Sequence, residues 1–232
     1  MSRSFGLVDY KVQEAEYFLL MMDREGRKNF FGVQFCASAF VSAARSVTFA
    51  MQSSLAGTPA FDVWYKPRQA MLRADPLARF FHDFRTLTQH IGENMVGGGS
   101  HGKEGTRYWF TPHPELLSVP EQDVLTASKA YFVQILQLVY DCYMELGPLI
   151  DGQQHFTDRH YASLGKTIED AEQAMGWPKG FTDIGDPDAL PYRWELIRKH
   201  ADGCNIEAQF EEWLGRYLPR PEPLPPYQSR AS

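Results

Sequence analysis

One long apolar segment, residues 30–51, constrains the fold of this chain more than any other feature. Its sequence, FFGVQFCASAFVSAARSVTFAM, is hydrophobic on nearly every side of a helix and is crowded with alanine and serine. A segment of this length could span a membrane, but Arg45 lies inside it, and a central arginine costs about 2.5 to 3.5 kcal/mol on membrane-insertion scales. The segment therefore predicts a buried central helix with closely packed neighbours, and no membrane contact.

The remaining sequence can surround such a helix. Hydrophobic residues make up 44% of the 232 residues, which is enough for one core and an appended subdomain. Asp9 is expected to cap the first helix, Asp75 and Pro76 to begin the fourth, Pro67 to kink or break the third, and Gly147-Pro148 to stop the fifth. Apolar residues at helical spacing predict long helices over residues 9–25, 29–55, 61–74, 76–94 and 120–146, and shorter helices near 157–175, 191–201 and 206–218.

No alternating pattern in the chain is long enough to build a sheet. The predicted fold class is therefore all-α, with an up-and-down helical bundle over residues 1–150. A second region, residues 151–232, is expected to hold additional C-terminal helices and to finish in a proline-rich, extended or disordered tail, PRPEPLPPYQSRAS.

Residues 95–119 are predicted to form a long loop with at most a short extended segment. Within it, GGGSHGK at residues 97–103 matches most of a phosphate-binding P-loop. Glu104 follows where Ser or Thr should bind magnesium, and no strand precedes the loop, so a nucleoside triphosphatase is rejected. Two alternatives stay open, namely a flexible loop after a helix, or a flap whose His101 and Lys103 contact substrate phosphates near His90.

The charges and cysteines limit location and partners. Cys36, Cys142 and Cys204 are odd in number, widely spaced and form no Cys-x-x-Cys pair, and the first residues lack the features of a secretory signal. A reducing, cytoplasmic location is expected. The net charge is -6, but residues 1–95 contain 11 Lys/Arg against 9 Asp/Glu, whereas residues 96–232 contain 12 against 20. A polyanion would prefer the first part, although uneven solvation of the surface explains the asymmetry equally well.

The predicted fourth helix, RFFHDFRTLTQHIGE, has a polar face opposite its apolar stripe. At about 100° per residue, its polar side chains form two neighbouring ridges. One ridge holds His82, Thr86 and His90, and the other holds Arg85, Gln89 and Glu93. Arg85 and His90 project about 140° apart, so one helix alone converges them poorly. A second copy of this helix across a two-fold axis could bring both types of group to one phosphate.

The segment from Arg85 to His90 resembles the motif of the HEPN superfamily, an arginine and a histidine separated by four to six residues. Residues 30–93 also resemble bacterial HEPN-like helical proteins in their overall sequence pattern. The resemblance covers about the first 150 residues. It implies a homodimer that cleaves RNA without a metal or cofactor, often in toxin or defence systems with an antitoxin or another protein partner. His90 would be the general acid or base, and Arg85 would stabilise the charge of the phosphorane.

The sequence departs from that family at Thr86, because active members commonly carry Asn, Asp or His after the arginine. The alternative is a catalytically silent bundle that binds RNA, a nucleotide or a protein. Arg45 must find a partner within its apolar helix, either as part of an anion site with Arg85 or in a buried ion pair with Asp83 or Glu93. The predicted substrate-binding residues are Arg45, His82, Thr86, Gln89, His101 and Lys103. The seven histidines form no metal-binding spacing, so no metal is expected.

Overall fold

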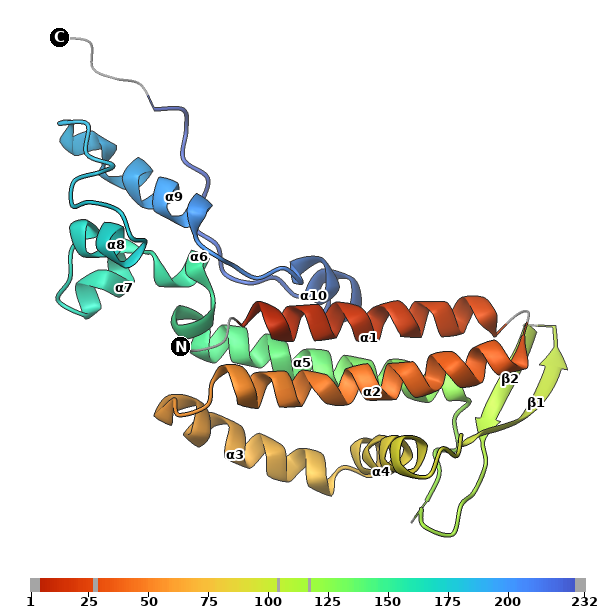
Figure 1. Cartoon of the computed structure of the whole chain (residues 1–232). Coiled ribbons are helices and arrows are strands. Elements are labelled where there is room, and N and C mark those ends of the chain that lie inside the picture. Colours follow the sequence, from red (N-terminus) through yellow and green to blue (C-terminus); the bar gives the residue numbers. More distant parts are fainter. Residues whose placement is uncertain (1–4, 27–28, 104, 117, 228–232) are drawn as a thin grey trace.

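The computed structural model describes residues 5–26, 29–103, 105–116 and 118–227, and it confirms the predicted predominantly α-helical fold class. Helices α1, α2 and α5 run along one another, α3 and α4 pack along one side, and a β-hairpin closes one end (Figure 1). The elements of this body are α1 Gly6–Glu25, α2 Phe30–Ser54, α3 Pro59–Ala74, α4 Pro76–His90, β1 Val96–Gly102, β2 Gly105–Phe110 and α5 Val124–Ile150.

The apolar segment forms α2, which lies at the centre of the body. Asn29 caps it by accepting a hydrogen bond from the backbone N–H of Phe31 (3.0 Å). By length and composition alone α2 could cross a membrane; in the structure it packs against α1, α4 and α5. Only 39% of its most apolar stretch is buried, however, and the side chains of Phe35 and Phe49 are 68% and 48% exposed. The central helix therefore has one uncovered face.

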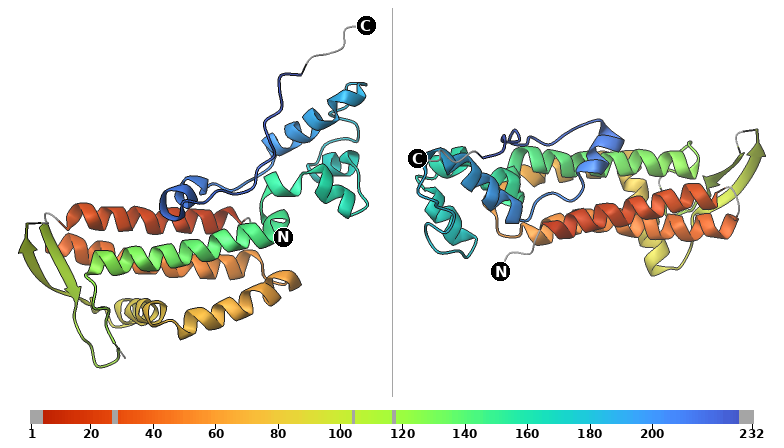
Figure 2. Two further views of the ribbon diagram at one scale, coloured as in Figure 1. Left: turned by 180° about the vertical axis from the view of Figure 1, so that it is seen from behind. Right: turned by 90° about the horizontal axis from the view of Figure 1, so that it is seen from above.

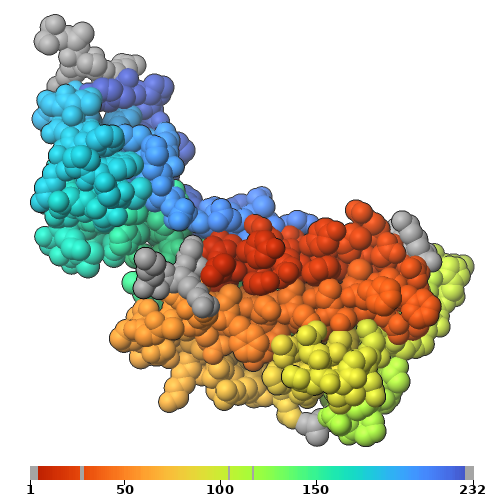
Figure 3. All heavy atoms as spheres, in the orientation of Figure 1, coloured from red at the N-terminus to blue at the C-terminus, as the bar shows by residue number. Residues whose placement is uncertain are grey.

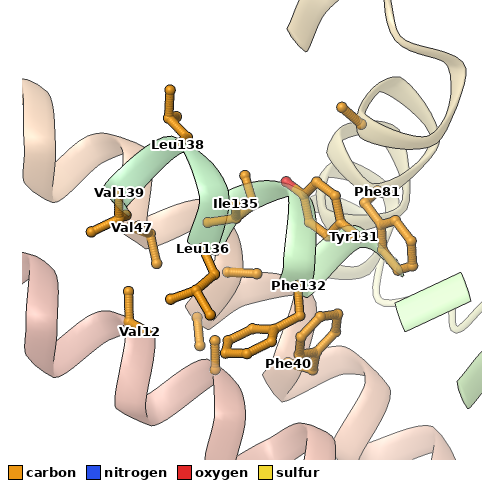
Figure 4. Close-up of a cluster of buried hydrophobic side chains, with 14 of the residues drawn as sticks. Val12, Phe40, Val47, Phe81, Tyr131, Phe132, Ile135, Leu136, Leu138 and Val139 are labelled. Atoms are coloured by element: carbon orange, nitrogen blue, oxygen red, sulfur yellow. The ribbon is translucent and has the colours of Figure 1, made fainter. Parts of the chain in front are cut away.

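Aromatic packing joins α2, α4 and α5 (Figure 4). Tyr131 of α5 stacks on Phe81 of α4, with ring centroids 4.6 Å apart and planes inclined by 6°. Phe40 of α2 meets both rings edge-on, at centroid distances of 6.4 Å from Tyr131 and 6.0 Å from Phe81. Such aromatic pairs add about 0.5 to 1.5 kcal/mol each beyond the area that they bury. This cluster fixes the position of α4 on the bundle.

Three predicted helix signals, at Asp9, Pro67 and Gly147-Pro148, are not followed in the structure. The first helix begins at Gly6, so Asp9 lies within it and is buried instead of capping it. The third helix runs through Pro67 without a break. Proline has no N–H, so the carbonyl of Val63 loses its helical hydrogen bond. Val63 is 78% exposed, and water can satisfy this carbonyl instead. The fifth helix does not stop at Gly147-Pro148 but continues to Ile150 after a kink at Leu146.

The glycine-rich loop contains the antiparallel hairpin β1–β2, which the sequence did not predict because glycine supplies no alternating side chains. Two of its glycines are required by close approaches. A Cβ atom at Gly97 would lie 1.8 Å from Oγ1 of Thr111, and one at Gly99 would lie 2.9 Å from the ring of Tyr108. The same residues that weaken the strand pattern therefore allow the chain to pack this closely.

The chain beyond α5 forms a smaller lobe at the end opposite the hairpin (Figures 2 and 3). Its separate hydrophobic cluster contains Tyr161, Ile168, Ala171, Trp194 and Ile197. The lobe holds α6 Gly152–His155, α7 Asp158–Ser163, α8 Ile168–Ala174, a 3-10 turn at Pro187–Ala189 and α9 Leu190–His200.

The chain then returns to the main body. Helix α10, Glu207–Leu214, packs on α5, and Ile206, Phe210 and Leu218 join the core of the body. Residues 219–227 form neither helix nor strand, and the predicted tail beyond residue 227 lies outside the described residues. Residues on both sides of position 150 thus build the first core.

Candidate anion-binding site

A cavity of 350 Å³ lies between α2, α3, α4 and α5. Its charged lining residues are Arg45 of α2, Arg73 of α3, and Arg79, His82 and Asp83 of α4. We call this cavity the basic pocket, because three guanidinium groups face one carboxylate. The junction between α3 and α4 forms one side of the pocket. Asp75 caps α4 by accepting a hydrogen bond from the backbone N–H of Ala78 (2.8 Å), and this cap holds the last turn of α3 next to the first turns of α4.

Arg45 lies at the inner side of the basic pocket and is half-buried. Its Nη1 donates a hydrogen bond to Oγ1 of Thr48 (2.5 Å), and its guanidinium lies over the ring of Phe49, 4.3 Å from the centroid. Its Nε is buried and has no hydrogen-bond partner among the described residues. A cation in this position attracts an anion strongly, since an unpaired donor out of water costs about 1 to 3 kcal/mol.

The structure does not form the alternative pairing predicted for Arg45. Neither Asp83 nor Glu93 lies within ion-pair distance of it, and Glu93 instead pairs with His113, whose Nε2 is 3.0 Å from the Glu93 carboxylate. Asp83 lines the basic pocket without forming an ion pair to a described residue. Neither Asp83 nor Glu93 therefore neutralises Arg45 through an ion pair.

Two tyrosines complete the inner wall of the basic pocket. Burial raises the pKa of Tyr131 to about 12, and the nearby charge of Arg45 partly opposes this rise. Burial likewise raises the pKa of Tyr65, again against the effect of Arg45. Both phenols are consequently neutral at physiological pH and keep their hydroxyl protons for hydrogen bonding.

Arg73 and Arg79 are exposed at the outer edge of the basic pocket. Within the described part of the chain, neither forms an ion pair or a side-chain hydrogen bond. Free guanidinium groups at the mouth of a concave site raise the local concentration of anions and present paired donors that match phosphate oxygens. The arrangement suits a phosphate-bearing ligand, with Arg45 inside and the two exposed arginines at the rim.

The predicted catalytic pair lies outside the basic pocket. Arg85 is half-buried and His90 is exposed as the last residue of α4; neither makes a hydrogen bond or an ion pair with another described residue. Thr86 donates its hydroxyl to the backbone oxygen of His82 (3.1 Å), and Gln89 donates through Nε2 to Oγ of Ser42 (3.0 Å). Of the predicted site residues, Arg45 and His82 line the basic pocket together, and Arg85 and His90 do not line it.

His101 and Lys103 line a different cavity, of 540 Å³, between the hairpin, the end of α1 and the start of α5. Nδ1 of His101 lies 3.0 Å from Oγ1 of Thr106 across the hairpin. Glu104, whose identity argued against a P-loop, lies outside the described residues. Among the side chains that the structure describes, no group of three or more His, Cys, Asp or Glu could hold a metal ion, and the three cysteines are free.

The sequence predictions missed Arg73, Arg79 and the two tyrosines of the basic pocket. A partial signal existed for Arg79, because it precedes His82 by three residues and so shares its helix face. No such signal existed for Arg73, which reaches the pocket only through the turn between α3 and α4.

One comparison with known proteins gave a match. Residues 29–93 are similar to the family described as Bacteriophage lambda protein ea47. The matched segment comprises α2, α3 and α4, which supply all the charged residues of the basic pocket. No curated protein and no solved structure matched the chain.

Proposed function

We propose that this protein binds RNA and that the basic pocket holds RNA phosphate groups. The observation that carries this proposal is the Arg45 guanidinium, which is half-buried, has an unpartnered Nε and lacks a carboxylate partner among the described residues. Natural proteins rarely leave such a cation uncompensated. A phosphate group entering the pocket supplies the missing negative charge and accepts hydrogen bonds from Arg45.

The size and charge of the pocket support a nucleotide unit as the bound group. A volume of 350 Å³ falls within the range of small-ligand sites, which is about 300 to 1,000 Å³. The chain as a whole is acidic, so the positive potential of this pocket favours binding of a polyanion at one face only. The choice of RNA follows from the HEPN-like motif on α4, the helix that contributes Arg79 and His82 to the pocket.

Fluorescence anisotropy with a labelled single-stranded RNA at low salt tests the proposal. Arg45→Ala and Arg73→Ala should each weaken binding about tenfold, because a charge-assisted hydrogen bond contributes about 1.5 to 3 kcal/mol. Arg24→Ala is the matched control, since Arg24 is an exposed arginine on α1 away from the pocket, and it should change the affinity less than twofold.

Two further measurements make the test decisive. Thermal unfolding of each variant checks that the fold is kept, and Arg73→Ala is the safer variant because Arg73 is exposed. An RNA affinity equally sensitive to Arg24 and Arg45 would overturn the assignment of the pocket. Binding of adenosine monophosphate without binding of RNA would replace RNA by a free nucleotide as the ligand.

A second candidate function is cleavage of RNA through Arg85 and His90. It is favoured by one observation: the guanidinium of Arg85 is not neutralised by any described carboxylate, and His90 is accessible on the same helix. In this chemistry the RNA 2′-hydroxyl loses its proton to a histidine and attacks the adjacent phosphorus, the 5′-oxygen leaves with a proton, and a 2′,3′-cyclic phosphate remains.

Incubation of an RNA pool with the protein in EDTA tests this second function. Arg85→Ala and His90→Ala should both abolish the cyclic-phosphate products, whereas His200→Ala, which removes an exposed histidine of the small lobe, should leave them unchanged. RNA that is bound but never cleaved would identify the protein as the binding scaffold. A role as a toxin or defence component with a protein partner depends on this cleavage and is proposed only together with it.

A further inference from the structure

The uncovered face of α2 forms a shallow groove with α1 and α4. The cavity has a volume of 480 Å³, and we call it the α2 groove. Its floor consists of the small residues of α2, Ser38, Ala39, Ser42, Ala43 and Ser46, and its sides include Lys11 and Glu14 of α1 and Gln89 of α4. In Figure 3, α2 is seen as an exposed orange band between α1 and α4.

The residues along this face are arranged symmetrically about Ser42. Ser38 and Ser46 lie four residues to either side of it, and Phe35 and Phe49 lie seven residues to either side. Offsets of four and seven both fall within about 40° of Ser42 on a helix, so these residues share one face. The residues three positions from Ser42 are not equivalent. Ala39 lines the α2 groove, whereas Arg45 lines the basic pocket.

We propose that the α2 groove binds a second copy of this chain, with the two α2 helices antiparallel and a two-fold axis passing near Ser42. A two-fold axis at this position places Phe35 of one copy opposite Phe49 of the other and sets the small residues against each other. Small residues let two helix backbones approach closely, and the two exposed aromatic rings at each end become buried in the interface.

The apolar surface extends from α2 onto α1. Tyr10 and Tyr17 lie four residues before and three residues after Glu14, and their side chains are 60% and 59% exposed. Phe31, one turn before Phe35 on α2, is 62% exposed. Aromatic residues of this kind are enriched in the centres of protein interfaces.

The charges in the α2 groove favour a protein partner identical to the chain. Nζ of Lys11 pairs with the carboxylate of Glu14 at 2.6 Å, so the groove has no net charge and two copies do not repel each other. A membrane is a poorer occupant, because this ion pair and the hydrogen bond between Gln89 and Ser42 would both enter an apolar medium. A protein interface accommodates such groups at its polar rim.

This pairing has a consequence for α4. Gln89 reaches Ser42 on the proposed axis, and Arg85 precedes Gln89 by one helical turn on the same ridge. The two-fold axis therefore brings the α4 helices of both copies to the same side of the dimer. Phe49 also contacts Arg45 of the basic pocket, so the interface borders that site as well. Dimer formation itself is independent of whether RNA binds.

Sedimentation equilibrium of the full chain without RNA tests the proposal. The wild-type protein should have twice the chain mass of 26.5 kDa at micromolar concentration. Ser42→Glu places two carboxylates against each other on the axis and should yield the monomer mass. Val63→Glu is the control, because Val63 is 78% exposed on α3, away from the groove, and this variant should remain dimeric.

A cross-linking variant gives a second test that does not depend on disrupting the dimer. Ser42→Cys should form an intermolecular disulfide under mild oxidation, since an axis residue lies next to its own copy, whereas Val63→Cys and the wild type should not. A monomeric wild type, a dimer insensitive to Ser42→Glu, or cosedimentation of the wild type with phosphatidylcholine vesicles would each overturn the proposal. RNA anisotropy of the Ser42→Glu variant separates a failure of pairing from a failure of the basic pocket.

Discussion

Asp9 illustrates how one side chain can acquire a role that its sequence position does not indicate. It is 1% exposed, and its carboxylate accepts hydrogen bonds from the hydroxyl of Tyr143 (2.7 Å) and the backbone N–H of Asn205 (2.8 Å). Burial raises the pKa of Asp9 from 3.8 to about 6, although both hydrogen bonds act in the opposite direction. Burial also raises the pKa of Tyr143, so the phenol remains the proton donor.

The raised pKa of Asp9 predicts that the fold becomes less stable as the pH increases from about 4 to about 6. In this window the folded state keeps a proton that the unfolded state has released, and a difference of about two pKa units corresponds to about 3 kcal/mol. Urea unfolding at pH 4.5 and pH 7 measures the change. Asp9→Asn should remove most of this pH dependence, and a variant that retains the full wild-type dependence would assign it to other groups.

At the residue scale, the sequence singles out a side chain that conflicts with its immediate surroundings. Arg45 could be identified because it is a charge within an apolar helix, and the structure places it in a cavity. Arg73 and Tyr131 could not be identified, because they are 58 positions apart and each is ordinary within its own helix. Only the packing of α3 against α5 brings them to one site.

At the scale of elements, helices were predictable where capping and apolar spacing agree. Asp75 caps α4 as expected, and Asn29, which was predicted to start the second helix, is its N-cap. The hairpin β1–β2 was missed because its first strand contains four glycines among seven residues, and glycine carries no information about alternation. The single helix predicted near residues 157–175 is divided into α7 and α8 by a turn at Gly165, where φ is +65°. The helix predicted near residues 206–218 ends earlier, at Leu214.

The small lobe depends on one buried carboxylate. Glu172 of α8 is 0% exposed and accepts hydrogen bonds from the backbone N–H of Gly180 (2.5 Å) and from the N–H (2.8 Å) and hydroxyl (2.5 Å) of Thr182. Nη2 of Arg193 lies 3.2 Å from the same carboxylate. Burial by itself would raise the pKa of Glu172, but these hydrogen bonds and Arg193 lower it. The carboxylate thus ties α8 to the following loop and to α9.

Glu172→Ala should unfold the small lobe while the main body stays folded. Removing one partner of a buried ion pair costs about 3 to 5 kcal/mol, which a cluster of five buried side chains cannot absorb. Hydrogen exchange followed by mass spectrometry should show lost protection across residues 158–200 and kept protection in α2 and α5. Glu169→Ala is the matched control, because Glu169 also pairs with Arg193 but is partly exposed. Equal loss of protection in both variants would contradict the assigned role of Glu172.

On the scale of the whole molecule, the main body is completed by residues from the far end of the sequence. Ile206 and Phe210 are 0% exposed, and Leu218 is 5% exposed, all within the first core. Glu16 of α1 accepts hydrogen bonds from Trp213 Nε1 (2.7 Å) and Gln209 Nε2 (2.8 Å). The predicted boundary after residue 150 matches the end of α5 but separates these groups from the helices that they cover.

A chain shortened to residues 1–150 should therefore fail to unfold cooperatively on heating. Losing the burial of Ile206, Phe210 and Leu218 removes on the order of 5 kcal/mol or more, which is comparable to the whole stability of a typical domain. Calorimetry of the shortened chain measures this directly. In the full chain, Phe210→Ala should lower the melting temperature strongly, and Phe181→Ala, at a ring that is 61% exposed, should not. A sharp transition in the shortened chain would show that the bundle is self-sufficient.

The contact between Asp9 and Asn205 spans 196 positions of the sequence, and this separation affects how the protein is made. At a translation rate of about 5 to 20 residues per second, α1 leaves the ribosome on the order of 10 to 40 s before its last partner. During that interval the nascent bundle keeps Asp9 and Glu16 without their donors and leaves the site of Phe210 open to solvent. For that time, we expect the surface that finishes the native core to be exposed to chaperones.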